Sequence, residues 1–125
     1  MKKLTTIISA VMALGLGTSA SAQVNLTAET ASPSSAPGVS VIALSEAAAK
    51  YNVANMQVTT GQTLTNSVQN VAEGKSDVAA APFVLPFLLS RAVGPYAKVG
   101  KEKGAELASQ LAVLYTYRIA CQGLY

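Results

Sequence analysis

The sequence predicts an α/β domain with a mostly parallel sheet and flanking helices. Between residues 24 and 82, segments suited to strands alternate with segments suited to amphipathic helices, which is the order of elements in such folds. Residues 58–82 contain one complete strand–helix–strand unit. Because such crossovers join parallel strands and almost always wind right-handed, both strands should end at one edge of the sheet. Ligands collect at that edge in open α/β folds.

The first 22 residues are predicted to be a cleavable signal peptide. A positively charged start, Lys2-Lys3, precedes a mainly apolar run over residues 4–17, and Ala20-Ser21-Ala22 places small residues where a signal peptidase reads them. An uncleaved membrane anchor is the less favoured alternative, because the run is shorter than the ~20 apolar residues of a spanning helix. We expect cleavage before Gln23, a periplasmic product, and one domain over residues 23–125.

The composition argues against several classes of function. Without Lys2 and Lys3 the chain keeps seven basic residues against six acidic ones, so it has no basic stripe of the kind that binds nucleic acid. It has no histidine and one cysteine, Cys121, which excludes the common zinc sites and histidine-assisted nucleophiles. Only Glu29 among the acidic residues lies near a predicted strand end, whereas carboxylate acid–base chemistry needs a pair. We therefore expect no metal, no cofactor and no catalytic activity.

The N-terminal part is predicted to form strand, loop, helix and strand. Residues 24–29 alternate apolar and polar side chains, as a half-buried strand does. Residues 30–38 are rich in serine, proline and alanine, which predicts a loop that is either a binding loop or a plain connector. Residues 40–51 are predicted to be a helix capped by Ser40, and residues 56–60 the second strand.

The next helix has the clearest signals. Thr63 or Thr65 can cap its start, and Gly74 can take the left-handed turn that ends it. Residues 78–81 then read as an apolar strand covered on both faces. In the turn before that strand, Asp77 is interpreted as a structural residue that accepts bonds from nearby backbone N–H groups. The apolar residues of the helix recur at helical spacing on one face: Leu64, Val68, Val71 and Ala72.

Beyond the third strand, a helix with Pro86 as its first residue is predicted to run to Ala92. Residues 96–104 carry three lysines and are interpreted as a solvated excursion rather than an anion-steering patch. Residues 106–110 add a helical turn.

Two more strands are predicted at residues 111–115 and 119–125, joined by a turn. Cys121 lies in the last of them, where it is either a small apolar residue or a partner for another chain. Because the sequence stops within a predicted strand, we expect it to be a fragment.

The candidate site is a set of polar, uncharged side chains at the predicted strand ends. Hydroxyls and amides beside a helix start suit the recognition of a carboxylate or a polar small molecule without reaction. The alternative is that these residues only cap their helices. The expected ligand-binding residues are Ser32, Ser34 and Ser35 in the first loop, Thr60, Gln62, Thr65 and Asn66 in the second, and Phe83 as an apolar wall.

A family likeness lies in the same stretch. Thr60-Gly61, the polar residues to Asn66, and Gly74-Lys75-Ser76-Asp77-Val78-Ala79 resemble the Gly-Gly-Ser, Asn-Leu and Gly-Glu-Ala-Asp-Leu-Ala pattern of TAXI-type periplasmic solute-binding proteins. These proteins are receptor subunits of tripartite ATP-independent (TRAP) transporters. The likeness covers most of residues 24–125.

The resemblance implies a type II periplasmic-binding-protein lobe that is truncated before the second lobe. It also implies a receptor that captures a small organic anion or an amino acid and delivers it to the membrane subunits of the transporter. We expect a monomer. Two other classes remain open, a small secreted α/β interaction domain without a solute site and an exported enzyme on the same two-lobed fold.

Overall fold

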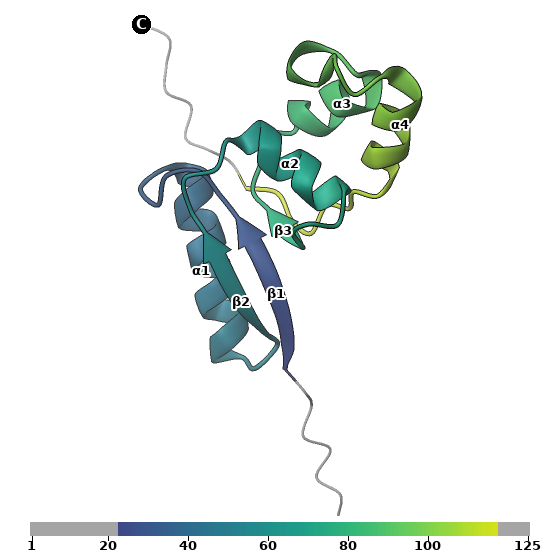
Figure 1. The fold of residues 1–125 in the computed structure, drawn as a ribbon. Helices are drawn as coiled ribbons and strands as arrows, with labels where there is room; N and C mark the ends of the chain where they lie inside the picture. The colour runs from purple at the N-terminus through teal and green to yellow at the C-terminus, as the bar shows by residue number, and fades with distance from the viewer. Residues whose placement is uncertain (1–22, 118–125) are drawn as a thin grey trace, which may run out of the picture.

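The computed structural model describes residues 23–117. The predicted signal peptide, the last residue of the turn predicted over residues 116–118, the last predicted strand and Cys121 lie outside the described residues. The elements are β1 (Val24–Glu29), α1 (Ala36–Lys50), β2 (Ala54–Thr59), α2 (Leu64–Ala72), β3 (Val78–Ala79), α3 (Val84–Arg91), the 3₁₀ turn η1 (Gly94–Tyr96) and α4 (Lys101–Ser109), arranged as in Figure 1.

The three described strands form a parallel sheet in the order β2-β1-β3. The β1–β2 ladder runs from Val24 opposite Ala54 to Glu29 opposite Thr59, and Glu29 also faces Ala79 of β3. The carboxyl ends of the three strands therefore meet at one edge, which confirms the predicted α/β class and the predicted parallel order. β3 has two residues rather than the four expected, so the β1–β3 ladder is short.

α1 begins four residues earlier than predicted because its cap is Ser35, not Ser40. The Ser35 side chain accepts the N–H of Gly38 at 3.2 Å, and Pro37 fits the first turn, where no intrahelical N–H bond is lost. Ser40 instead donates its hydroxyl to the Pro37 carbonyl within the helix. Gly38 is required here, since a Cβ would lie 2.1 Å from the Ser32 carbonyl oxygen.

α2 has the bounds that the sequence predicts. Thr63 caps its start, and Gly74 follows it with a φ of +72°. Both signals are local, which is why they could be read from the sequence.

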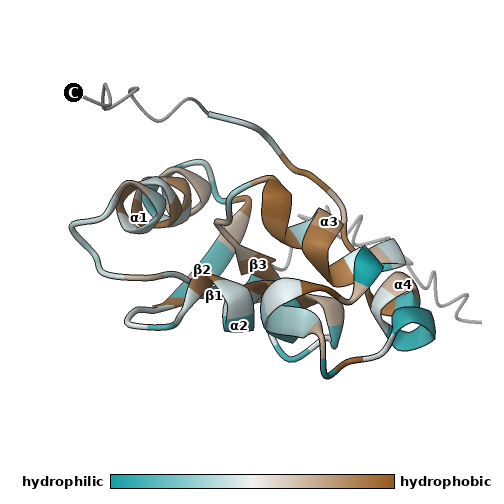
Figure 2. Cartoon of the chain, turned by 90° about the horizontal axis from the view of Figure 1, so that it is seen from above, coloured by the Kyte–Doolittle hydropathy of each residue, from teal (hydrophilic) through white to brown (hydrophobic). Residues whose placement is uncertain are grey.

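The main apolar core lies among the helices. It contains six buried side chains from α2, α3, η1 and α4, of which Leu89 is 0% exposed. Figure 2 shows α3 as an apolar helix beside α4, whose outer side is hydrophilic. α3 and α4 approach closely at Gly104, where a Cβ would lie 2.4 Å from the Leu89 carbonyl oxygen. The core residues are Val68, Ala72, Leu85, Leu89, Tyr96 and Leu107.

Three predictions for the C-terminal part differ from the structure. Residues 96–104 are not only a solvated excursion, because Tyr96 is 2% exposed and Lys101 begins α4, although the three lysines, Ala97 and Glu102 are exposed. Residues 111–115 are extended but form no ladder within the described part of the chain, and Val113 is 66% exposed. Pro86 is the third residue of α3, not the first.

Among the described residues, no helix is long and apolar enough to cross a membrane.

Candidate functional site

The loops that follow β1 and β2 lie side by side at the carboxyl edge of the sheet. The N–H of Gly61 donates to the Ala31 carbonyl at 3.1 Å, and the N–H of Gln62 donates to the Thr30 carbonyl at 3.1 Å. The first loop (residues 30–35) and the second loop (residues 60–66) are thus fixed to each other by backbone bonds. Neither loop contains a charged residue.

In the first loop, two of the three predicted serines are free to meet a ligand. Ser32 and Ser34 are exposed, with their hydroxyl oxygens 3.0 Å apart. The Ser35 hydroxyl donates to the Ser32 carbonyl at 2.6 Å and accepts the N–H of Gly38. Ser35 therefore caps α1, as the alternative interpretation has it.

In the second loop, Thr63 holds the start of α2. Its hydroxyl oxygen accepts the N–H of Asn66 at 3.4 Å and the hydroxyl of Thr65 at 3.2 Å. Thr60 and Asn66 are exposed, whereas Gln62 and Thr65 are half-buried. The structure places all four predicted residues of this loop around one helix start.

The two helix starts differ in the backbone donors that they leave open. In α1, Pro37 has no N–H, and those of Gly38 and Val39 are bonded to Ser35, which leaves Ala36. In α2, no bond within the described residues uses the N–H groups of Leu64 and Thr65. The first turn of α2 is therefore better suited than that of α1 to bind an oxygen acceptor such as a carboxylate.

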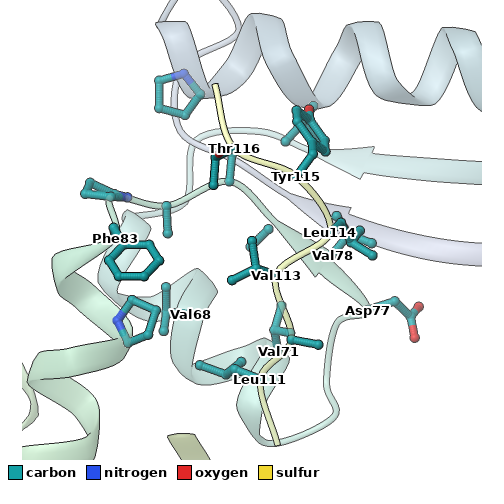
Figure 3. Close-up of a pocket in the computed structure, with 18 of the residues that line it drawn as sticks. Val68, Val71, Asp77, Val78, Phe83, Leu111, Val113, Leu114, Tyr115 and Thr116 are labelled. Carbon is teal, nitrogen blue, oxygen red and sulfur yellow. The ribbon is translucent and has the colours of Figure 1, made fainter. Parts of the chain in front are cut away.

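Phe83 belongs to a different feature. It is 78% exposed and lines a cavity of about 890 Å³, shown in Figure 3. None of the seven polar candidate residues lines this cavity. Its walls come from α1, α2, β3, the start of α3 and residues 111–117, and include Val41, Leu44, Val71, Val78 and Leu111. The apolar run after α4 was the only sequence signal for it.

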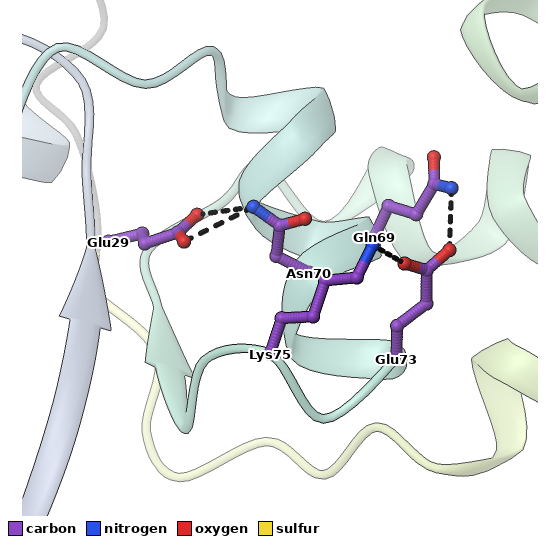
Figure 4. Close-up of polar contacts among 5 residues, drawn as sticks. All are labelled: Glu29, Gln69, Asn70, Glu73 and Lys75. Carbon is purple, nitrogen blue, oxygen red and sulfur yellow. Dashed lines mark hydrogen bonds and ion pairs between the residues drawn. The ribbon is translucent and has the colours of Figure 1, made fainter.

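Glu29 ends β1 and is bound by an amide that the sequence did not single out. The side-chain NH₂ of Asn70 donates to both carboxylate oxygens of Glu29, at 3.1 and 3.0 Å (Figure 4). At the end of α2, a separate group surrounds Glu73: the Lys75 ammonium and then the Gln69 amide, at 2.7 Å, lower the pKa of that carboxyl. Asn70 thus occupies the place that a second carboxylate would need for acid–base chemistry with Glu29.

Asp77 has a structural role, as the sequence indicates, but its partner is Thr27, 50 residues away, and not the nearby backbone. Its carboxylate accepts the backbone N–H of Thr27 at 2.8 Å and the Thr27 hydroxyl at 2.9 Å. These bonds favour the charged form and lower the pKa of Asp77. The residue thereby ties the turn before β3 to the middle of β1.

Within residues 23–117, no group of three or more cysteine and acidic side chains could hold a metal ion. No family model, no curated protein and no solved structure matches the chain.

Proposed function

We propose that the chain is part of a TAXI-type solute-binding receptor of a TRAP transporter, exported to the periplasm, that captures a small organic anion or an amino acid. The observation that supports this proposal best is the edge at which the first and second loops are bonded together. That edge combines exposed hydroxyls and amides with two open N–H groups of α2, in the place where open α/β sheets bind ligands.

The chemistry of the edge suits binding without reaction. A carboxylate of the solute would accept the N–H groups of Leu64 and Thr65, and hydroxyls such as those of Ser34 and Thr60 would orient its polar groups. In this proposal the described sheet is one lobe of a type II binding protein. Closure of a second lobe over the solute would shift the population that the membrane subunits recognise.

The test is a thermal-shift experiment on the full chain with L-alanine, L-glutamate, succinate and lactate as probes. A probe that binds only the folded state raises the melting temperature as its concentration rises. Ser34→Ala and Thr60→Val should each weaken binding by about three- to tenfold, the value of one hydrogen bond. Ser109→Ala is the matched control, because Ser109 is exposed on α4 and bonds only to Glu106. If no probe shifts the transition, the receptor proposal loses its support.

A secreted interaction domain is the second candidate, and one observation favours it. Residues 111–117 run extended along the apolar cavity with Val113 66% and Leu114 71% exposed, and apolar surface of this kind often meets another polypeptide. The partner that this alternative commits to is a second copy, since each copy carries the same extended apolar segment and identical segments can pair about a twofold axis.

Sedimentation velocity over a concentration series separates the two candidates. Self-association that Val113→Lys abolishes would support the interaction domain. Val24→Lys is the control, because Val24 is also exposed, 56%, at the far end of β1. A monomer at every concentration would remove the support for this alternative and agrees with the receptor.

A further inference from the structure

Tyr96 is a buried tyrosine that lies outside the candidate site and forms a hydrogen bond to it. It lies in η1, 2% exposed, within the helical core. Its hydroxyl donates to the carbonyl of Thr65 in the first turn of α2, at 2.8 Å. Because a buried hydroxyl cannot exchange its partner for bulk water, the positions of Tyr96 and of this turn depend on each other.

The bond continues to the surface of the second loop. The carbonyl of Thr65 and the N–H of Asn66 belong to one peptide group, and that N–H donates to the Thr63 hydroxyl oxygen at 3.4 Å. The Thr65 hydroxyl donates to the same oxygen at 3.2 Å. Hydrogen bonds in such a chain polarise one another, so each becomes stronger than it would be alone.

Thr63 is the last residue in this series of hydrogen bonds, and its hydroxyl is left to act as a donor. Its oxygen accepts two hydrogen bonds, from Asn66 and Thr65, so its own proton remains to be donated. A hydroxyl has one proton and two lone pairs. Thr63 is exposed, and it directly precedes Leu64, whose N–H group, like that of Thr65, has no acceptor within the described residues. A hydroxyl and two N–H groups that are left to donate favour an oxygen acceptor.

We propose that Tyr96 is a positioning residue of the candidate site: through the Thr65 carbonyl it fixes the first turn of α2, so that Thr63, Leu64 and Thr65 present three donors to a ligand carboxylate. This inference rests on the proposed function for its ligand. The bond from Tyr96 to α2 does not depend on that function and can be tested without a ligand.

The first test compares Tyr96→Phe with the wild type by amide hydrogen exchange on the full chain. Exchange at Asn66 and Ser67 should become about three- to tenfold faster. Gly38 and Val39 are the internal control, because they occupy the same positions in the first turn of α1 and are also bonded to a cap. Tyr115→Phe is the control variant, since the Tyr115 hydroxyl makes only an exposed 3.5 Å contact with Ser40.

Two results of this exchange test would overturn the proposal. Unchanged exchange at Asn66 and Ser67 would show that Tyr96 does not hold the turn. Equal acceleration at Gly38 and Val39 would show a general loss of stability rather than positioning.

The second test uses whichever of L-alanine, L-glutamate, succinate and lactate shifts the wild-type melting transition. Tyr96→Phe should weaken the binding of that probe about three- to tenfold, and Tyr115→Phe should leave it unchanged. Equal affinity of Tyr96→Phe and wild type would overturn the positioning role. If no probe binds the wild type, the proposed function fails, and the exchange result alone decides the role of Tyr96 in holding α2.

Variants of Thr63 provide a second test of the site that does not depend on the folding of the Tyr96 variant. Thr63→Ser keeps the hydroxyl and should retain most of the probe binding that Thr63→Val loses. Thr63→Val removes the acceptor and the donor, and should accelerate exchange at Asn66 and weaken the probe. If Thr63→Val bound the probe as the wild type does, the donor role of Thr63 would be wrong.

Discussion

The helical half and the sheet half of the described chain bury their apolar side chains to very different extents. Around Leu89, α2, α3, η1 and α4 close a core of six buried residues. In the sheet half, the buried apolar residues are Ala28, Val41 and Ala54, while Val53 is 66% exposed and an apolar cavity opens beside β3. The difference teaches that packing holds the helices together, whereas ladders, caps and short polar bonds position the loops at the sheet edge.

The same substitution in both halves should give the largest contrast. Leu89→Ala removes a fully buried side chain from a closed core and should lower the free energy of unfolding by about 2–5 kcal/mol, because it leaves a cavity. Leu44→Ala removes a half-buried side chain that already borders a cavity, and should cost about 1 kcal/mol. Urea denaturation of both variants measures this contrast. Equal losses would show that the sheet half is packed as tightly as the helices.

Alanine substitutions at two glycines should show a smaller difference in stability between the two halves. A Cβ on Gly104 would meet the Leu89 carbonyl, which is held in the middle of the helical core, so Gly104→Ala should cost about 1–3 kcal/mol by forcing α3 and α4 apart. A Cβ on Gly38 would meet the Ser32 carbonyl in the exposed first loop.

That loop lies outside the helical core, so we expect its displacement by Gly38→Ala to cost less global stability than Gly104→Ala and to weaken the bonds from Gly61 and Gln62 to the first loop. Urea denaturation gives the global cost, and amide exchange at Gly61 and Gln62 gives the local one. A larger global loss for Gly38→Ala than for Gly104→Ala would contradict the contrast.

Local signals made part of the fold predictable. Thr63 and Gly74 each act on the turn in which they stand, so the bounds of α2 followed from the sequence. The start of α1 was mispredicted because Ser35 and Ser40 are both good caps, and Pro37-Gly38 resembles loop composition although proline fits a first turn. Distinguishing them depends on the bond from Gly38 to Ser35.

Features that depend on distant residues could not be predicted. Tyr96 lies close to several lysines in the sequence, but it packs in the helical core, and its hydroxyl bonds to Thr65, 31 residues away. The partner of Glu29 is 41 residues away at Asn70. Residues 111–115 have strand-like composition, but a strand also needs a neighbour, and none of the described strands pairs with them.

The candidate site could likewise be predicted only in part. The meeting of the first and second loops follows from parallel strand order alone. The residue that caps each helix determines which hydroxyls and N–H groups remain without a partner. In α1 that residue is Ser35, so Ser32 and Ser34 stay exposed. The placement of Phe83 in the cavity depends on where α3 begins.

The smallest expected effect distinguishes two surface carboxylates, one from each half. Asp77 in the sheet half accepts hydrogen bonds from two neutral donors of Thr27, which lower its pKa from the ordinary value of an aspartate. Glu73 at the end of α2 has a lowered pKa chiefly because of the Lys75 ammonium. In both cases the charged form favours the folded chain. The stabilisation is present above the unfolded pKa and is lost as pH falls through the lower folded value.

Asp77→Asn should therefore reduce stability slightly at neutral pH and make the loss of stability in acid shallower, because the asparagine has no carboxyl to protonate. Glu73→Gln should act in the same direction, but its effect should shrink in high salt because its largest contribution, the exposed ion pair with Lys75, is screened. The effect of Asp77→Asn should persist in high salt, since an N–H and a hydroxyl carry no net charge. Urea denaturation at low and high salt, from neutral to acid pH, measures both. If high salt reduced the effect at Asp77 as strongly, its bonds to Thr27 would not be what ties β3 to β1.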